Sequence, residues 1–443
     1  MKHTKKYKKL NIKKTLKKKR ISVNISNIKP VIHTINNYKI ILIHIPNHIA
    51  YIESFINNGF ITEKKHNAGI NHLLEHILVN AWKGCNNLPC LETWGKKGVK
   101  INAHTENNNL SYHAKSLKDQ LYETLDYIIT ITTKAKFKTK DIKIEVTPVL
   151  NEILMYINNT ERKLLNIINK NLWKYEGLQY GDDYKQQLSN LKKIKLTNLQ
   201  NFYDNYYTPS NTVFVVTGDF NTNNVLSIFK KSLPPPAIKE KTKIFDNCFS
   251  YKKGIFYLNK KGTKTSECIM TFPTNIKQHS KSAYMLILAI KCLRQAVFSH
   301  LRYKMKLIYK FSDNVITNSC GTTISFHFWT PCPKTKSCYE EVIKIINQYK
   351  TENISDSVID SCKKKILMNY LISPFNPQYI ARLYGHQYLN QLHHAKPTLY
   401  SPKDIKDIII KTTGDEIKNI LKETLVIDNL TFAYESNKSA NIT

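Results

Sequence analysis

The chain has 443 residues, 42% of them hydrophobic, which suits a globular protein of two or three domains and excludes an intrinsically disordered one. An uncharged apolar run of roughly 18 residues, the minimum for a membrane-spanning helix, does not occur in the sequence, so we expect no membrane segment. The formal net charge of +34 would attract nucleic acid, so a basic nucleic-acid-binding protein is one alternative. It is disfavoured because only five of the 67 basic residues are arginines and no nucleic-acid motif occurs.

The chain begins with a lysine-rich segment, and no acidic residue precedes Glu53. A transit-like leader, a nuclear-type basic tract and a solvated tail all share this composition. Because transit peptides favour arginine and serine over lysine, we predict that residues 1–29 form a disordered tail.

The nine cysteines are an odd number in a chain too large to depend on disulfides. We therefore predict reduced thiols in an intracellular, reducing compartment, with the cytoplasm favoured over the mitochondrion. Cys85 and Cys90 lie close together, as do Cys332 and Cys338, but neither spacing is typical of a structural zinc site.

Two short strands are predicted before the first helix. The stretch from Tyr38 to Ile52 is apolar, but His44, Pro46 and Asn47 interrupt it near its middle. Proline and asparagine favour turns, so this interruption predicts a turn between two strands.

A helix predicted from His72 to Ala81 opens with the pattern H-x-x-E-H. At helical spacing His72, Glu75 and His76 share one face, and apolar residues form another. Two imidazoles on one face can bind Zn²⁺, and a carboxylate beside them can act as a base for an attacking water. The pattern is the inverted zincin signature, although a polar helix stripe without a function can also contain it by chance.

A second amphipathic helix is predicted within residues 145–156. It carries Glu145 and Glu152, which are seven residues apart and therefore lie on one face. A catalytic zinc commonly takes three protein ligands and a water, so the H-x-x-E-H helix needs one ligand from elsewhere. The sequence alone does not show whether this second helix meets the first.

A proline- and lysine-rich linker, residues 233–245, divides the chain near its middle. Each half begins with short strands, continues with a long apolar helix and ends on a strand, and the second half has no H-x-x-E-H motif. Mixed strands and helices of this kind predict α+β domains. We predict a metal-binding domain at residues 30–232 and a metal-free domain at residues 246–443.

The chain resembles the pitrilysin/insulinase family of inverted zinc metallopeptidases, which includes the β subunit of the mitochondrial processing peptidase. In this family a glutamate ligand follows the motif at the spacing that Glu152 shows, 76 positions after His76, and a supporting acid stands where Glu145 stands. The resemblance covers most of residues 30–435. It implies two homologous α+β domains, each an antiparallel-rich sheet with helices on one face, and one Zn²⁺ per chain bound by His72, His76 and Glu152.

Two further stretches resemble the family. Residues 98–112 are similar to an edge strand that binds substrate backbone, which implies substrate contacts at Asn102 and Ala103. Residues 301–309 are similar to a segment whose Arg and Tyr stabilise the developing oxyanion, which implies that role for Arg302 and Tyr309, in cis or in trans.

The chain also departs from the family pattern, including in the loop after the metal-binding helix, residues 79–84. Pro148 lies between Glu145 and Glu152, so we expect the helix to begin near Glu145, where proline in the first turn is tolerated. The glycine that usually precedes the family tyrosine is absent, and Leu307 and Ile308 stand there.

The leading hypothesis is a zinc metalloendopeptidase that hydrolyses short or unfolded peptides, with Glu75 as the general base. The resemblance also implies a homodimer or a heterodimer with a related chain. The alternative is a catalytically silent member of the family that acts as a binding or assembly subunit.

Overall fold

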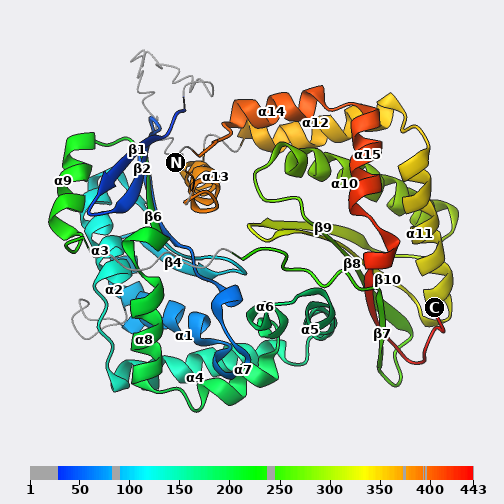
Figure 1. The fold of residues 1–443 in the computed structure, drawn as a ribbon, viewed down its shortest axis with the longest axis horizontal. Coiled ribbons are helices and arrows are strands. Elements are labelled where there is room, and N and C mark those ends of the chain that lie inside the picture. Colours follow the sequence, from blue (N-terminus) through cyan, green and yellow to red (C-terminus); the bar gives the residue numbers. More distant parts are fainter. Residues whose placement is uncertain are drawn as a thin grey trace, which may run out of the picture.

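The computed structural model describes residues 28–81, 90–236, 245–372, 376–392, 394 and 397–442. Two sheets, each covered by helices, lie side by side in this part of the chain (Figure 1). Most of the tail predicted at residues 1–29, the core of the linker predicted at residues 233–245, and Cys85 lie outside the described residues.

The first sheet has six strands in the order β1-β2-β6-β3-β5-β4. Its strands are β1 (Val31–Ile35), β2 (Tyr38–His44), β3 (Ile49–Ile56), β4 (Lys100–Thr105), β5 (Leu110–Leu117) and β6 (Thr212–Gly218). Only β2 and β6 pair in parallel, and the other pairs are antiparallel. The two strands predicted before the first helix are β2 and β3. At the far edge, β4 pairs with β5 on one side and leaves its other side open within this sheet.

One face of the first sheet carries the main core of the first half. The helices of this half are α1 (Ile70–His76), α2 (Cys90–Lys96), α3 (Leu121–Thr133), α4 (Thr139–Tyr156), α5 (Thr160–Leu172), α6 (Glu176–Tyr180), α7 (Tyr184–Leu191), α8 (Leu196–Tyr206) and α9 (Thr222–Ser232). Ile40 and Leu42 of β2 point into this core, whereas Ile41 and Ile43 point to the opposite face. This period of two is the alternation of a strand that is buried on both faces.

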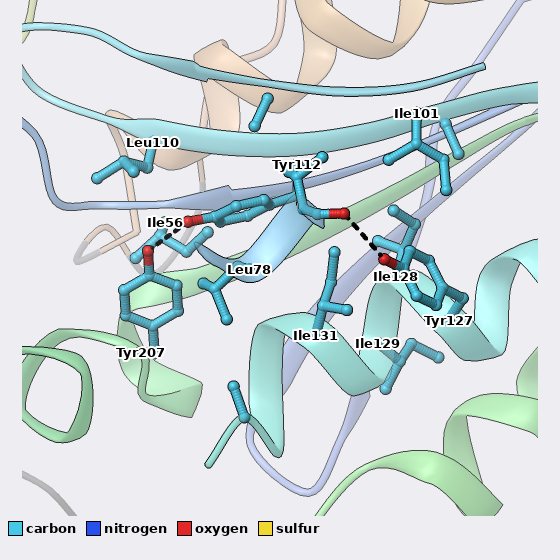
Figure 2. Close-up of a cluster of buried hydrophobic side chains, with 14 of the residues drawn as sticks. Ile56, Leu78, Ile101, Leu110, Tyr112, Tyr127, Ile128, Ile129, Ile131 and Tyr207 are labelled. Atoms are coloured by element: carbon cyan, nitrogen blue, oxygen red, sulfur yellow. Dashed lines mark hydrogen bonds between the residues drawn. The ribbon is translucent and has the colours of Figure 1, made fainter. Parts of the chain in front are cut away.

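A buried tyrosine pair braces this core beside α1. The hydroxyl oxygens of Tyr112 on β5 and Tyr207 at the end of α8 lie 2.7 Å apart, and the two rings stand among aliphatic side chains such as Leu78 (Figure 2). Burial raises the pKa of both phenols. Each hydroxyl is the other's hydrogen-bond partner, so neither polar group is buried without compensation.

The second half repeats this plan with a five-stranded sheet in the order β7-β11-β8-β10-β9. Its strands are β7 (Gly254–Asn259), β8 (Thr265–Thr274), β9 (Phe311–Asn318), β10 (Gly321–Pro331) and β11 (Thr431–Ser436). Its helices are α10 (Lys281–Ser299), α11 (Thr335–Thr351), α12 (Asp356–Ile372), α13 (Pro377–Leu389), α14 (Pro402–Lys411) and α15 (Gly414–Thr424). The predicted α+β class and the similarity of the two halves are confirmed.

Each half gives one helix to the free face of the other half's sheet, which the sequence analysis did not anticipate. Helix α13 packs on β3 and β6 through Ile380, Ala381 and Tyr384, and α5 packs on β8 and β11 (Figure 1). Gly385 allows the close approach of α13, because a Cβ at this position would overlap the ring of Phe55. The exchange ties the two halves together.

A buried ion pair anchors α13 to the first sheet. Glu53 on β3 is fully buried, and its Oε2 lies 3.3 Å from Nε of Arg382 and 2.9 Å from the hydroxyl of Tyr51, which donates to it. Burial raises the pKa of Glu53, and the Arg382 cation opposes that rise. The pair joins residues that are far apart in sequence, so it specifies where α13 docks.

One helix bears on the expectation of no membrane segment, although Lys291 and Arg294 interrupt its apolar run. Within the described residues, Lys281–Lys304, which comprises α10 and the π-helical turn η7 (His300–Lys304), is long and apolar enough by length and composition to cross a membrane. Its side chains supply much of the second core, including Leu286, Ile290 and Leu293. This burial is typical of the central helix of a globular domain.

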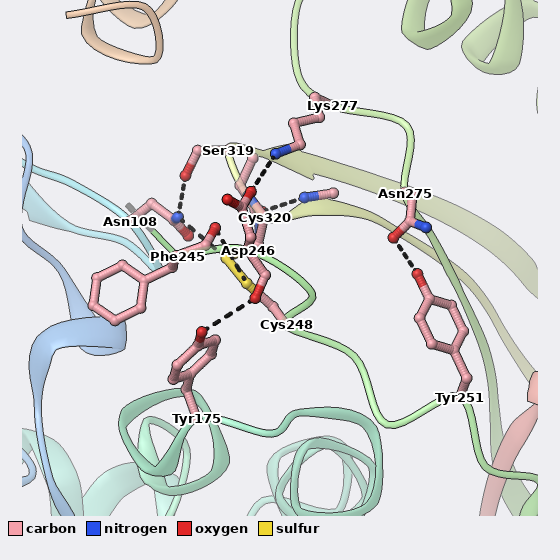
Figure 3. The surroundings of a disulfide bond; sticks show 12 residues. Asn108, Tyr175, Phe245, Asp246, Cys248, Tyr251, Asn275, Lys277, Ser319 and Cys320 are labelled. Atoms are coloured by element: carbon pink, nitrogen blue, oxygen red, sulfur yellow. Dashed lines mark hydrogen bonds and ion pairs between the residues drawn. A yellow bond between two sulfur atoms is a disulfide. The ribbon is translucent and has the colours of Figure 1, made fainter. Parts of the chain in front are cut away.

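A disulfide contradicts the expectation that all cysteines are reduced. Cys248 and Cys320 are bonded, with their Cα atoms 5.7 Å apart, and the bond connects the segment that enters the second half to the turn between β9 and β10 (Figure 3). Asn108 of the first half donates to Ser319 beside this bond. Cys90 is also disulfide-bonded. Sequence separation could not predict the Cys248–Cys320 pair, because the fold brings together residues 72 positions apart.

Candidate metal centre

The helix that carries the H-x-x-E-H motif begins at a specific backbone structure. Gly69 precedes α1 with a φ of 97°, a conformation that favours glycine. The buried carboxylate of Glu63 accepts hydrogen bonds from the backbone N–H groups of Gly69 and Asn71, at 2.9 and 3.0 Å. A carboxylate here satisfies donors that the first turn leaves free, and it complements the helix dipole. Burial outweighs these bonds and raises the pKa of Glu63 to about 7.

The prediction that Pro148 would mark the first turn of the helix with Glu152 is wrong. Helix α4 does not begin near Glu145; it runs without interruption from Thr139 to Tyr156, with Pro148 in its interior. An interior proline removes one hydrogen bond, to the carbonyl four residues earlier, here that of Ile144. Ile144 itself is exposed, so the hydrogen bond is lost in a part of the helix that solvent reaches.

Three side chains from α1 and α4 converge as a possible ligand set. Oε2 of Glu152 lies 3.5 Å from Nε2 of His72 and 3.4 Å from Nε2 of His76. Bonds of about 2.1 Å at tetrahedral angles place ligand atoms about 3.4 Å apart, so this spacing fits Zn²⁺. All three side chains are partly exposed, which leaves room for a further ligand from solvent.

Glu145 lies behind this set. Its side chain is 1% exposed, and its Oε2 lies 3.5 Å from Nδ1 of His76. Its other oxygen accepts a hydrogen bond of 2.7 Å from the amide of Asn80, on the π-helical turn η4 (Ile77–Ala81) that continues α1. A carboxylate beside Nδ1 favours the tautomer that carries its proton there and leaves Nε2 free to bind a metal.

The charges of the cluster affect two of its pKa values. Burial lowers the pKa of His76, but Glu145, Glu75 and Glu152 together outweigh burial and leave it raised. The hydrogen bond with His72, opposed by burial, lowers the pKa of Glu152. The cluster therefore stabilises positive charge, which a metal cation would supply in place of protons.

Glu75 points from α1 toward the edge strand β4. Its Oε2 accepts a hydrogen bond of 2.6 Å from the hydroxyl of Thr105, the last residue of β4. Asn102 and Ala103 precede Thr105 on the same strand, where the Asn102 side chain accepts a hydrogen bond from the Ala103 N–H. An extended peptide added to this edge would lie next to Glu75.

Arg302 and Tyr309 lie together in the second half and away from this cluster. The guanidinium of Arg302 stands 4.8 Å from the centre of the Tyr309 ring and donates to the carbonyl of Ile308. Tyr309 is 78% exposed. Among the described contacts, neither residue touches His72, His76 or Glu152.

Two supporting residues were missed by the sequence analysis, and each had a usable signal. Asn80 stands four residues after His76, a helical spacing that puts it on the motif's face. Thr105 stands two residues after Ala103 on β4, and side chains at this spacing point to the same side of the sheet. Glu63 gave no signal, because its role depends on a loop that folds back onto α1.

Paired α+β halves with a His–His–Glu cluster on one of them are typical of a zinc peptidase, and comparisons with known proteins agree. The model of the family described as insulinase (peptidase family M16) matches residues 39–181. The model described as the peptidase M16 inactive domain matches residues 193–366. The chain belongs to this insulinase, or pitrilysin, family of peptidases.

The relatives and structural neighbours extend over different parts of the chain. An uncharacterized zinc protease of Rickettsia felis is 22% identical over 84% of this chain and 90% of its own length. The β subunit of the mitochondrial processing peptidase of Caenorhabditis elegans is 24% identical over 41% of this chain, and the match spans only 39% of that subunit. The crystal structure of a protease from Helicobacter pylori superimposes with a TM-score of 0.80 at 17% identity, over 92% of this chain and 99% of that one.

Proposed function

We propose that the protein is a zinc-dependent metalloendopeptidase whose ligands are His72, His76 and Glu152. The observation that carries this proposal is the approach of Glu152 to both Nε2 atoms at the separation of zinc ligands. The family and the zinc-protease names of relatives support the same reaction class.

In this proposal the chain's own residues position the substrate and move the proton. Bound zinc would act as a Lewis acid that activates water and the peptide carbonyl. Glu75, oriented by Thr105, takes the proton of the attacking water and passes it to the leaving amine. The open edge of β4 holds the peptide as an added strand through Asn102 and Ala103, which selects extended, short or unfolded peptides.

We also propose that Arg302 and Tyr309 act in trans, in a homodimer or in a heterodimer with a related chain. The exposure of Tyr309, and the lack of any contact between this pair and the cluster among the described residues, support this assignment. Two comparisons are consistent with assembly: a relative is named as a subunit, and a structural neighbour is titled Complex III2 of Candida albicans (TM-score 0.77, 12% identity, covering 93% of this chain and 97% of that one).

The first test is metal dependence. The purified protein is expected to contain bound zinc and to cleave a quenched-fluorescence peptide library. Chelation should remove both the metal and the cleavage, and restoring Zn²⁺ should restore cleavage. Cleavage that persists in metal-free protein would contradict a metallopeptidase, and bound zinc without any cleavage would favour the silent family member.

A second prediction concerns the residue behind His76. Glu145→Gln keeps the shape of the side chain but removes the negative charge beside Nδ1, so we expect zinc affinity to fall about 10- to 100-fold, as for other outer partners of metal-ligating histidines. Asn80→Ala leaves the Glu145 carboxylate in place and should therefore lower the zinc affinity less. Competition with a zinc-binding dye measures both. Unchanged affinity in Glu145→Gln would show that Glu145 does not support the ligand.

A further inference from the structure

A second group of metal-ligand side chains lies where the two halves meet. Glu161 is in the first turn of α5, which belongs to the first half, whereas Glu267 on β8 and His327 on β10 belong to the second. One donor atom from each lies within 4.8 Å of the others. None of these residues takes part in the cluster on α1 and α4.

The imidazole of His327 is held between the two carboxylates. Its Nε2 lies 2.9 Å from Oε1 of Glu267, and its Nδ1 lies 3.8 Å from Oε1 of Glu161. The ring also packs against Trp329, with centroids 3.9 Å apart. The contact between His327 and Glu267 is a hydrogen bond in the absence of an ion, and it needs to open only to about 3.4 Å for both atoms to bind a tetrahedral metal. Glu161 faces the other ring nitrogen, but its side chain is half exposed and free to turn, and one ligand atom from each of the three residues lies within 4.8 Å of the others.

Lysine and arginine balance the charges of this group only in part, because Arg162 interacts electrostatically with Glu161 but forms its ion pair with Asp182. Although the chain carries a net charge of +34, neither Glu161 nor Glu267 forms an ion pair with a lysine or arginine among the described residues. By contrast Glu435, directly across from Glu267 on the neighbouring strand, pairs with Lys260 at 2.7 Å. Two carboxylates that share one imidazole favour a bound cation, because positive charge there offsets their repulsion.

The surroundings allow an ion to enter and to complete its coordination. Glu161 and His327 line a cavity of about 730 Å³ between α5 and the second sheet. A cavity of this size holds several waters, which can supply the remaining ligands. One imidazole and two carboxylates without sulfur suit a divalent transition metal such as Zn²⁺ or Mn²⁺ and disfavour Cu⁺.

We propose that Glu161, Glu267 and His327 form a second metal site, which binds one divalent transition-metal ion and links the two halves. The ion clamps α5 onto the second sheet. Only residues 157–159 separate α5 from α4, which carries Glu145 and Glu152. A clamp on α5 therefore also restrains the helix that completes the first cluster.

The experiment counts bound ions in full-length protein with the first cluster disabled. Metal-free Glu152→Gln protein is dialysed against buffered Zn²⁺, and in parallel against Mn²⁺, and the bound metal is measured by elemental analysis. We expect one ion per chain in this background, none when His327→Ala is added, and at least about tenfold weaker binding when Glu161→Gln is added. Because Glu161 is exposed, its substitution should leave the fold intact.

The matched controls are His300→Ala and Glu341→Gln, added to the same background. His300 and Glu341 form a pair at the same 2.9 Å, but among the ion pairs of the described residues no second carboxylate meets that histidine. Both controls should keep the ion, and Zn²⁺ should raise the melting temperature of the controls but not of the His327→Ala protein. Equal ion counts in the His327→Ala, Glu161→Gln and control proteins would overturn the proposal. If Glu152→Gln fails to empty the first cluster, every count rises by one and the differences remain.

Discussion

Glu75→Gln is expected to abolish most peptide hydrolysis while the protein keeps its zinc. The amide has the size of the carboxylate and can still accept the hydrogen bond from Thr105, but it cannot take a proton from water. Loss of a general base reduces kcat/KM by about 10²- to 10⁴-fold. Because Glu75 is not one of the three converging ligands, elemental analysis should find wild-type zinc content.

The control for this prediction is Glu92→Gln, the same substitution on a half-exposed glutamate that pairs with Lys96 on α2. It should hydrolyse a quenched peptide at the wild-type rate. Hydrolysis by Glu75→Gln at that same rate would remove Glu75 as the base. Loss of zinc from Glu75→Gln would instead indicate that this carboxylate helps to hold the metal.

Local patterns in the sequence predicted the first helix and the class of the fold, because both depend on the periodicity of apolar residues. The spacing of His72, Glu75 and His76 puts them on one helix face in any α-helix, and β2 and β3 follow from an apolar stretch broken by a turn. Glu152 required a family resemblance, since nothing within a single helix says which other helix it will meet.

The features that the sequence did not predict are mostly contacts between segments far apart in the chain. Helix α13 shows no sequence signal that it belongs on the first half's sheet, where Arg382 meets Glu53. The same holds for the disulfide between Cys248 and Cys320. The effect of Pro148 was misjudged for a different reason: the cost of an interior proline depends on whether the freed carbonyl reaches water, and that exposure is a property of the folded helix.

Glu152→Gln is expected to remove most of the zinc bound between α1 and α4, and hydrolysis with it. His72 and His76 both lie within 3.5 Å of this one carboxylate, so its loss leaves two neutral nitrogens and no negatively charged ligand to bind the ion. A neutral amide oxygen is a weaker zinc ligand than a carboxylate. We therefore expect affinity to fall by more than about 100-fold, beyond the range for an outer partner such as Glu145.

Which of Glu152→Gln and Glu145→Gln loses more zinc affinity distinguishes a ligand from a supporting residue. If Glu152 binds the metal and Glu145 only orients His76, Glu152→Gln must lose more zinc than Glu145→Gln when both are measured by the same dye competition. Excess Zn²⁺ should restore hydrolysis largely in Glu145→Gln and poorly in Glu152→Gln, because only the latter lacks a ligand. Full zinc occupancy of the cluster on α1 and α4 in Glu152→Gln, or a larger loss of zinc affinity in Glu145→Gln, would require another residue as the third ligand.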